Sequence, residues 1–82
     1  MEIRVKVFGN KKGDFTLEVD EGTIVKDIFK RLIDMGFLDS DPDEIFNFVV
    51  LVNDIEISAL KGEKTSLKDG DRVVFIPVIH GG

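Results

Sequence analysis

A single stretch of the chain has the apolar periodicity of an α-helix, and this feature constrains the fold more than any other. The stripe that we expect to face the core consists of Ile24, Val25, Ile28, Phe29, Leu32, Ile33 and Met35. Thr23 precedes the stripe as a predicted N-cap, and Gly36 follows it as a predicted stop. Because one helix covers only one face of a sheet, the remaining apolar residues are expected to form strands that share this helix.

Two stretches with alternating apolar and polar residues precede the helix. The alternation runs along residues 1–8 and again along residues 15–20, and it is typical of half-buried strands. Residues 9–13 contain Gly and Asn, which tolerate the left-handed backbone of tight turns. The two stretches are therefore predicted to form a β-hairpin.

The segments after the helix predict three further strands. Residues 48–52 are a continuous apolar run, which favours a strand that is covered on both faces or lies at a sheet centre. Asn53 and Asp54 predict a turn, and residues 55–58 a short return strand. Residues 60–67 have no clear periodicity, and residues 72–78 read as the last strand.

The order of these elements predicts an α+β fold of the β-grasp type. A mixed sheet of four to five strands would pack on one main helix, with the later strands beside the first and partly parallel to it. The 82 residues fit one domain, and we expect residues 1–82 to form it, with a flexible diglycine tail at residues 79–82.

Composition disfavours several classes of function. The net charge of −5 argues against a nucleic-acid partner, which requires a concentrated basic face. The chain contains no cysteine, so it offers no disulfide, thiol nucleophile or zinc-finger spacing. Its apolar runs are too short to cross a bilayer and no secretory signal is evident, so we expect a cytoplasmic protein without a membrane partner. The seven phenylalanines carry no polar group and are suited to burial.

An acidic connection follows the helix. Asp39, Asp41 and Asp43 have the spacing of a calcium loop, and the proline after Asp41 permits one short helical turn. Glu44, however, occupies the position of the sharp-turn glycine, and Val50 stands where a bidentate glutamate is needed. A solvated loop is therefore favoured over a calcium site, and no metal site is predicted.

The given sequence ends on Gly81-Gly82, directly after the last predicted strand. Glycine has no side chain to clash and adopts almost any backbone conformation. We expect such a stalk to enter a narrow tunnel in another enzyme and to present the α-carboxylate of Gly82 as the reactive group.

Residues 67–82 resemble the carboxyl end of the ubiquitin-like β-grasp sulfur carriers. The shared pattern is a leucine, the turn Asp69-Gly70-Asp71, an apolar strand, Pro77, a short spacer and Gly81-Gly82. This group includes the molybdopterin synthase small subunit, the thiamine-pathway sulfur carrier and the ubiquitin-related modifier. His80 before the diglycine is more similar to the last of these.

The resemblance implies a carrier rather than an enzyme. An ATP-dependent activating enzyme, of the type that activates ubiquitin, would adenylate Gly82, and sulfur from a persulfide would then convert it to a thiocarboxylate. The chain itself would bind no cofactor, since ATP is used by the partner. The expected sulfur recipient is a molybdopterin precursor, in which case the large subunit of molybdopterin synthase is a further partner.

The sequence is also compatible with other functions. The activated Gly82 would equally suit attachment to lysines of other proteins, as in ubiquitin, and His80 suggests transfer RNA thiolation as another use of the sulfur. A β-grasp interaction module without tail chemistry is a further alternative. His80 is interpreted as a tail residue that binds in a partner's groove or is solvated, rather than as a general base.

A partner surface is also predicted from strand alternation. Val74 and Ile76 share the outward face of the last strand, and Phe8 has the same parity on the first strand. If the two strands pair, these three side chains form an exposed apolar patch, which we expect to dock the activating enzyme. Alternatively, residues 60–67 or a register shift would cover the patch.

Overall fold

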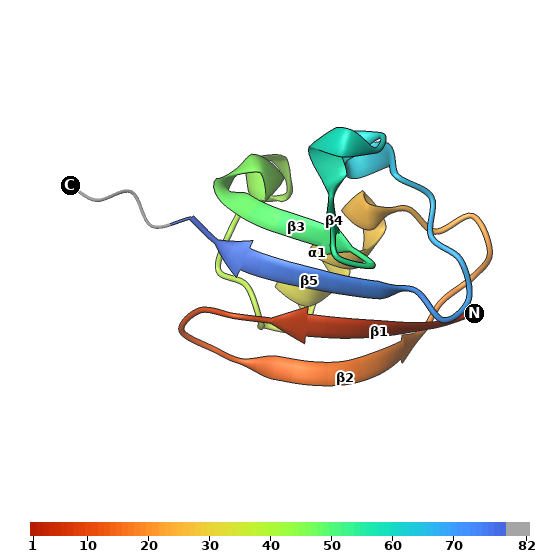
Figure 1. The fold of residues 1–82 in the computed structure, drawn as a ribbon. Coiled ribbons are helices and arrows are strands. Elements are labelled where there is room, and N and C mark those ends of the chain that lie inside the picture. Colours follow the sequence, from red (N-terminus) through yellow and green to blue (C-terminus); the bar gives the residue numbers. More distant parts are fainter. Residues whose placement is uncertain (79–82) are drawn as a thin grey trace.

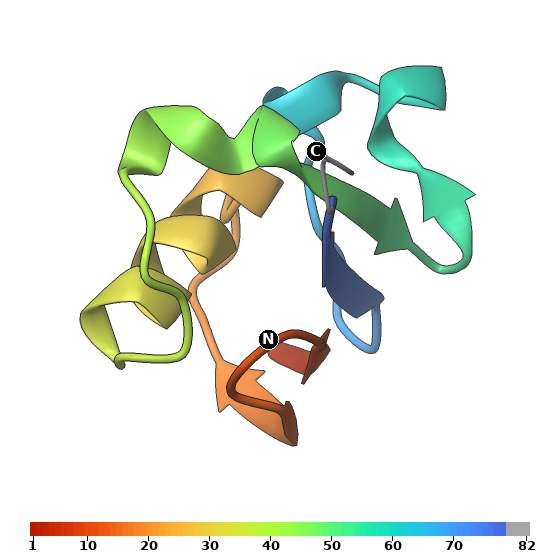
Figure 2. The ribbon, with the colours of Figure 1, turned by 90° about the vertical axis from the view of Figure 1, so that its left-hand side faces the viewer.

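A mixed β-sheet and one α-helix form two layers (Figures 1 and 2). The computed structural model describes residues 1–78. Its strands are β1 (Glu2–Val7), β2 (Gly13–Glu18), β3 (Phe48–Val52), β4 (Ile55–Glu56) and β5 (Arg72–Pro77). Within this described part the only α-helix is α1 (Val25–Asp34), and the 3₁₀ helices are η1 (Pro42–Asn47), η2 (Ile57–Ala59) and η3 (Gly62–Lys64).

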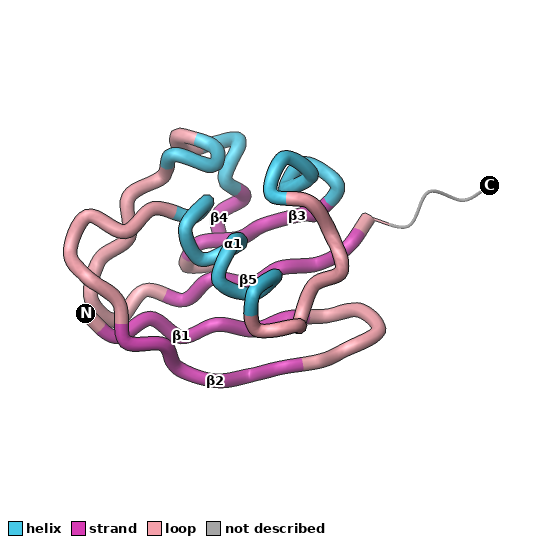
Figure 3. The backbone as a smooth tube through the Cα atoms, turned by 180° about the vertical axis from the view of Figure 1, so that it is seen from behind, coloured by secondary structure: helices cyan, strands magenta, loops and turns pink. Residues whose placement is uncertain are grey.

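The last strand lies at the centre of the sheet. Across residues 1–78 the strand order is β2-β1-β5-β3-β4, and β5 runs parallel to β1 while every other neighbouring pair is antiparallel. Figure 3 shows α1 in front of the sheet from the opposite side. The predicted α+β architecture, a β-grasp with a mixed sheet on one main helix, is confirmed.

The core lies between α1 and the sheet. The helix buries the side chains of Val25, Ile28, Phe29 and Leu32. The ring of Phe29 lies 5.3 Å from that of Phe48 and 6.0 Å from that of Phe75, measured between ring centres. Edge-on and tilted contacts of this kind are favourable for aromatic pairs, so this ring joins β3 and β5 to the helix.

The start of α1 differs from the prediction. The helix begins at Val25 with Ile24 as its N-cap, so the assignment of Thr23 as the N-cap was wrong. Thr23 Oγ1 instead donates a hydrogen bond to the carbonyl of Asp20 at 2.7 Å. The carboxylate of Asp27 accepts a hydrogen bond from the Ile24 N–H at 3.0 Å, which satisfies one of the free donors at this end.

The predicted stop at Gly36 is confirmed. Gly36 has a φ of +81°, and its N–H donates to the carbonyl of Ile33 at 3.0 Å. The N–H of Phe37 reaches back to the Leu32 carbonyl at 2.9 Å, which completes a Schellman motif. Met35, predicted to face the core, is exposed because the regular helix ends one residue before it.

The turn between β3 and β4 follows the predicted chemistry. Asn53 and Asp54 both have positive φ, at 51° and 69°, as a two-residue type I′ hairpin requires. The return strand is shorter than predicted. Instead of residues 55–58 it covers only Ile55–Glu56, because η2 begins at Ile57.

Side chains of the turn before β5 fix the position of that strand. The Asp71 carboxylate accepts hydrogen bonds from the Lys68 N–H at 2.7 Å and from Asn53 Nδ2 at 2.9 Å. Asn53 Oδ1 accepts from the Arg72 N–H at 3.0 Å, and the Asp71 backbone carbonyl accepts from the Arg4 N–H at 2.9 Å. These bonds tie the start of β5 to β1 and to the β3–β4 turn at once.

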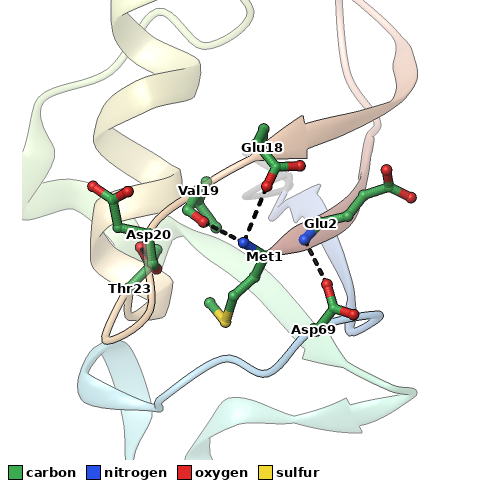
Figure 4. Close-up of polar contacts among 7 residues, drawn as sticks. All are labelled: Met1, Glu2, Glu18, Val19, Asp20, Thr23 and Asp69. Atoms are coloured by element: carbon green, nitrogen blue, oxygen red, sulfur yellow. Dashed lines mark hydrogen bonds and ion pairs between the residues drawn. The ribbon is translucent and has the colours of Figure 1, made fainter.

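The amino end of the chain is held by a second set of polar contacts (Figure 4). The Met1 amino group donates to Glu18 Oε1 at 3.1 Å and to the Val19 carbonyl at 2.7 Å. The Glu2 N–H donates to Asp69 Oδ1 at 2.7 Å. The hydrogen bond to Glu18 raises the pKa of the Met1 amino group above its ordinary value of 8.0.

Replacing Asp71 by alanine should destabilise the fold by about 1 to 3 kcal/mol, because it leaves the hydrogen bonds from Lys68 and Asn53 without their acceptor. Urea denaturation measures the change. Asp34→Ala is the matched control, since its carboxylate makes no hydrogen bond or ion pair within residues 1–78. Equal stabilities for the two variants would contradict the role assigned to Asp71.

The free energy of unfolding should fall at alkaline pH in a preparation with a free Met1 amine. A raised pKa means that the folded state binds this proton more tightly than the unfolded state. The stabilisation is complete below pH 8.0 and is lost as the pH rises through the raised pKa. In Glu18→Gln, the free energy of unfolding, measured by urea denaturation at each pH, should depend less on pH in this range. An unchanged pH dependence would show that the hydrogen bond to Glu18 does not contribute to it.

Candidate functional site

The face of the sheet that points away from α1 carries a group of apolar side chains. Cross-strand partners share a face, and the register pairs Val49 with Ile76 and Leu51 with Val74. Phe8 follows β1 beside this group, with its N–H bonded to the Phe75 carbonyl at 3.0 Å. We name these five residues the outer-face patch: Phe8, Val49, Leu51, Val74 and Ile76.

The accessible part of the patch lies toward the end of β5. Phe8 and Val49 are each 37% exposed, and Ile76 is half-buried. Val74 is only 8% exposed, less than expected, because Lys6 and Leu51 flank it on the two neighbouring strands. A partner would therefore contact mainly the three residues at the end of the sheet.

The loop of residues 60–67 does not cover the patch. It packs on the helix side, where the Val25 N–H donates to the Thr65 carbonyl at 3.0 Å. The Leu67 N–H donates to the Thr23 carbonyl at 3.1 Å, and the side chain of Leu67 belongs to the core. β1 and β5 pair with Lys6 opposite Val74, which is the register that brings Phe8, Val74 and Ile76 to the same face as predicted.

Basic side chains border the patch although the chain is acidic overall. Lys6 Nζ lies 5.1 Å from the centre of the Phe8 ring, a cation–π distance. Arg4 and Arg72 are register partners on the same face, and Arg4 also pairs with Asp14 at 3.4 Å. Two carboxylates lie on this face as well, because Asp14 is the register partner of Lys6 and Glu56 that of Leu51. The three basic residues outnumber them, so the border is basic on balance and suits a partner that presents apolar residues and carboxylates.

Sequence reasoning missed two members of the patch, Val49 and Leu51. The run of residues 48–52 was interpreted as a strand covered on both faces or central in the sheet. In the structure Val50 and Val52 enter the core, whereas Val49 faces outward and is open. Strand alternation could have identified them, because alternate residues of β3 must face away from the helix, and these residues are as apolar as the outward residues of β5.

A cavity of about 420 Å³ opens at the same end of the molecule. It is lined by Phe8, Gly9, Asn10, Lys11, Gly36, Phe37, Leu38, Asp39, Phe48 and Pro77. Gly9 has a φ of +126°, and a β-carbon there would lie 3.3 Å from Pro77 Cγ, so the hairpin loop closes on the end of β5. With Lys11 and Asp39 as its charged residues, the lining suits an apolar group better than a charged cofactor.

The predicted tail residues His80, Gly81 and Gly82 lie outside the described residues. The described chain reaches Val78, whose N–H donates to the Asn47 carbonyl at 2.9 Å. The segment from β5 toward the tail thus starts at the end of the sheet that carries Phe8 and Val49 (Figure 1).

The acidic connection does not gather into a metal site. Among residues 1–78, no group of three or more His, Cys, Asp or Glu side chains is arranged to hold a metal ion. The short turn predicted after Asp41 is confirmed as η1. Across the same residues, no helix has the length and apolar character needed to span a bilayer.

The fold is that of a ubiquitin-like β-grasp protein. The family model of ThiS matches residues 5–82, and the chain belongs to the ThiS family. It is also 47% identical over 34 residues to ubiquitin-related modifier 1 of Schizosaccharomyces pombe. That match covers 42% of this chain and 35% of the relative, so it spans about a third of the relative's length.

Solved structures share the fold over almost the whole chain. One is a chain of the complex of subunits 1 and 2 of the molybdopterin-converting factor from Helicobacter pylori, with 24% identity, full coverage of both chains and a TM-score of 0.68. SAMP1 from Haloferax volcanii is 18% identical, also with full coverage of both chains, at a TM-score of 0.76. Urm1 from Trypanosoma brucei is 24% identical over 99% of this chain and 95% of its own, at 0.69. The predicted membership in the ubiquitin-like sulfur carrier and modifier group is confirmed.

Proposed function

We propose that the protein is a sulfur carrier whose Gly82 carboxylate is adenylated by a partner enzyme and then converted to a thiocarboxylate. The observation that carries this proposal is the ThiS family match over residues 5–82, which includes Gly81-Gly82. The fold supports it, because β5 leads toward this segment from the centre of the sheet. The protein itself would act as a carrier in the cytoplasm, not as a catalyst.

The chemistry belongs to the partners. A carboxylate oxygen of Gly82 attacks the α-phosphate of ATP bound by the activating enzyme, and pyrophosphate leaves. A persulfide sulfur of a partner then attacks the acyl carbon and displaces AMP. A second partner thiol cleaves the resulting S–S bond, which leaves a thiocarboxylate on Gly82 and a disulfide on the partner. Every thiol must come from partners, because the chain contains no cysteine.

The outer-face patch would dock the activating enzyme. Its accessible residues Phe8, Val49 and Ile76 lie at the end of the sheet from which the chain continues beyond Val78. Four further residues reach at most ~14 Å, so an enzyme that held Gly82 would have to approach this end closely. Binding at the patch would orient the carrier, and the tail would then enter the site where ATP is held.

A molybdopterin precursor is our first choice of sulfur recipient, as the pattern from Asp69-Gly70-Asp71 to Pro77 suggests. The large subunit of molybdopterin synthase would then receive the tail. The Helicobacter pylori neighbour, described as part of a complex of two subunits of the molybdopterin-converting factor, is consistent with such a partner.

Protein modification is the second candidate. The 47% identity to ubiquitin-related modifier 1 over 34 residues favours it, since an adenylated Gly82 is also an electrophile for lysine amines. The same resemblance also supports transfer RNA as an alternative recipient of the sulfur, which His80 suggested from the sequence.

Mass spectrometry of the protein from its host distinguishes the two candidates. For a sulfur carrier we expect a fraction of the intact chain to be heavier by the difference between one sulfur and one oxygen atom, localised to Gly82. Diglycine remnants on lysines of other proteins, without that mass shift, would instead identify a modifier. If neither signal is found in a host that uses the protein, both candidate functions are contradicted.

Phe8→Asp and Ile76→Asp should each weaken binding of the host's activating enzyme about tenfold or more, because they place a charge in an apolar contact. Lys30→Asp places the same side chain on the exposed side of α1, in the other layer of the fold, and should bind normally. Isothermal titration gives the affinities, and circular dichroism checks the fold. Native binding by both patch variants would discard the patch as the docking surface.

A further inference from the structure

Phe46 is the most exposed large apolar side chain of residues 1–78. It is 72% exposed, although phenylalanines of this chain were expected to be buried. Its neighbour Ile45 is buried in the core, so η1 is anchored to the body of the protein. Phe46 is therefore displayed on a fixed element and not on a loose loop.

The element that carries Phe46 lies beside the end of β5. Asn47, the last residue of η1, accepts the hydrogen bond from the Val78 N–H at 2.9 Å. Figure 2 views the molecule from this end and shows η1 close to the finish of β5. A protein that takes up the segment after Val78 would come within reach of Phe46.

Carboxylates surround Phe46 along the sequence. Asp43 and Glu44 precede it in η1, and Asp43 is exposed like Phe46. The carboxylate of Glu44 accepts hydrogen bonds from the Asp41 N–H and from Asn47 Nδ2, each at 3.1 Å. Asp43 forms no ion pair within the described part of the chain.

We propose that Phe46 and Asp43 form a second contact for the adenylating enzyme, and that the enzyme offers an apolar pocket bordered by arginine or lysine. This rests on the proposed function, because it names part of the same partner. A guanidinium stacks on an aromatic face and pairs with a carboxylate at the same time, so arginine suits this pair of side chains best. Nucleic acids and anionic lipid surfaces carry negative charge and are repelled by Asp43 and its acidic neighbours.

The two contacts differ in their balance of charge. Lys6, Arg4 and Arg72 border the outer-face patch, whereas η1 is acidic around Phe46. A partner with matching charges at both contacts would bind in one orientation and be repelled in the reversed one. This arrangement selects the docking pose that directs the chain after Val78 into the partner.

Titration of the full-length protein into the host's adenylating enzyme without ATP tests this contact. Phe46→Ala should raise the Kd about tenfold or more, as expected for an aromatic anchor, with an unchanged circular dichroism spectrum. The matched control is Ile55→Ala, which truncates a 48% exposed side chain at the opposite end of the sheet and should bind normally. Asp43→Asn should raise the Kd about two- to fivefold at low salt and reduce the dependence of Kd on KCl.

The outcomes separate this inference from the proposed function. If the unaltered protein is adenylated but Phe46→Ala binds like Ile55→Ala, the second contact is wrong and the carrier function stands. If Phe46→Ala weakens binding while Asp43→Asn leaves the salt dependence unchanged, the basic border of the partner pocket is refuted. If the unaltered protein is not adenylated at all, the proposed function fails and this inference with it.

Discussion

The insertion of β5 between β1 and β3 is the constraint on which the rest of the structure depends. A strand near the end of the chain occupies the centre of the sheet, so the core is incomplete until it pairs on both sides. Asp71 and Asn53 fix where it enters. Alternate side chains of β5 then serve two purposes, because Val73 and Phe75 are fully buried under α1 while Ile76 contributes to the outer-face patch.

This placement leaves the two faces of the sheet with different surroundings. The helix layer fills one face of the sheet, and in the described structure the other face keeps an apolar group with basic neighbours. The chain continues beyond Val78 from the end where this group is most accessible. Under the proposed function, the surface that is recognised and the residue that reacts would be chemically separate, as suits a protein that another enzyme uses as its substrate.

The sequence predicted the architecture well because its signals are local and periodic. The stripe of α1, the hairpin alternation and the Asn53-Asp54 turn each belong to a few adjacent residues, and connection rules then restricted the topology. The predicted N-cap at Thr23 was wrong because the carboxylate of Asp27 accepts a hydrogen bond from the Ile24 N–H and so fixes the start of the helix one residue later. Val49 was missed because an outward apolar surface looks like a core in sequence, and Phe46 because one aromatic residue in a 3₁₀ turn has no periodicity to orient it.

The central claim is that the reactive atom of this protein is the terminal carbonyl of Gly82, activated by an enzyme that recognises the folded body. ATP–pyrophosphate exchange by the host's adenylating enzyme tests it most directly. We predict that the intact protein supports exchange, and that a variant lacking only Gly82 binds the enzyme with similar affinity but supports none. Equal exchange with the shortened variant, or none with the intact protein, would contradict the account.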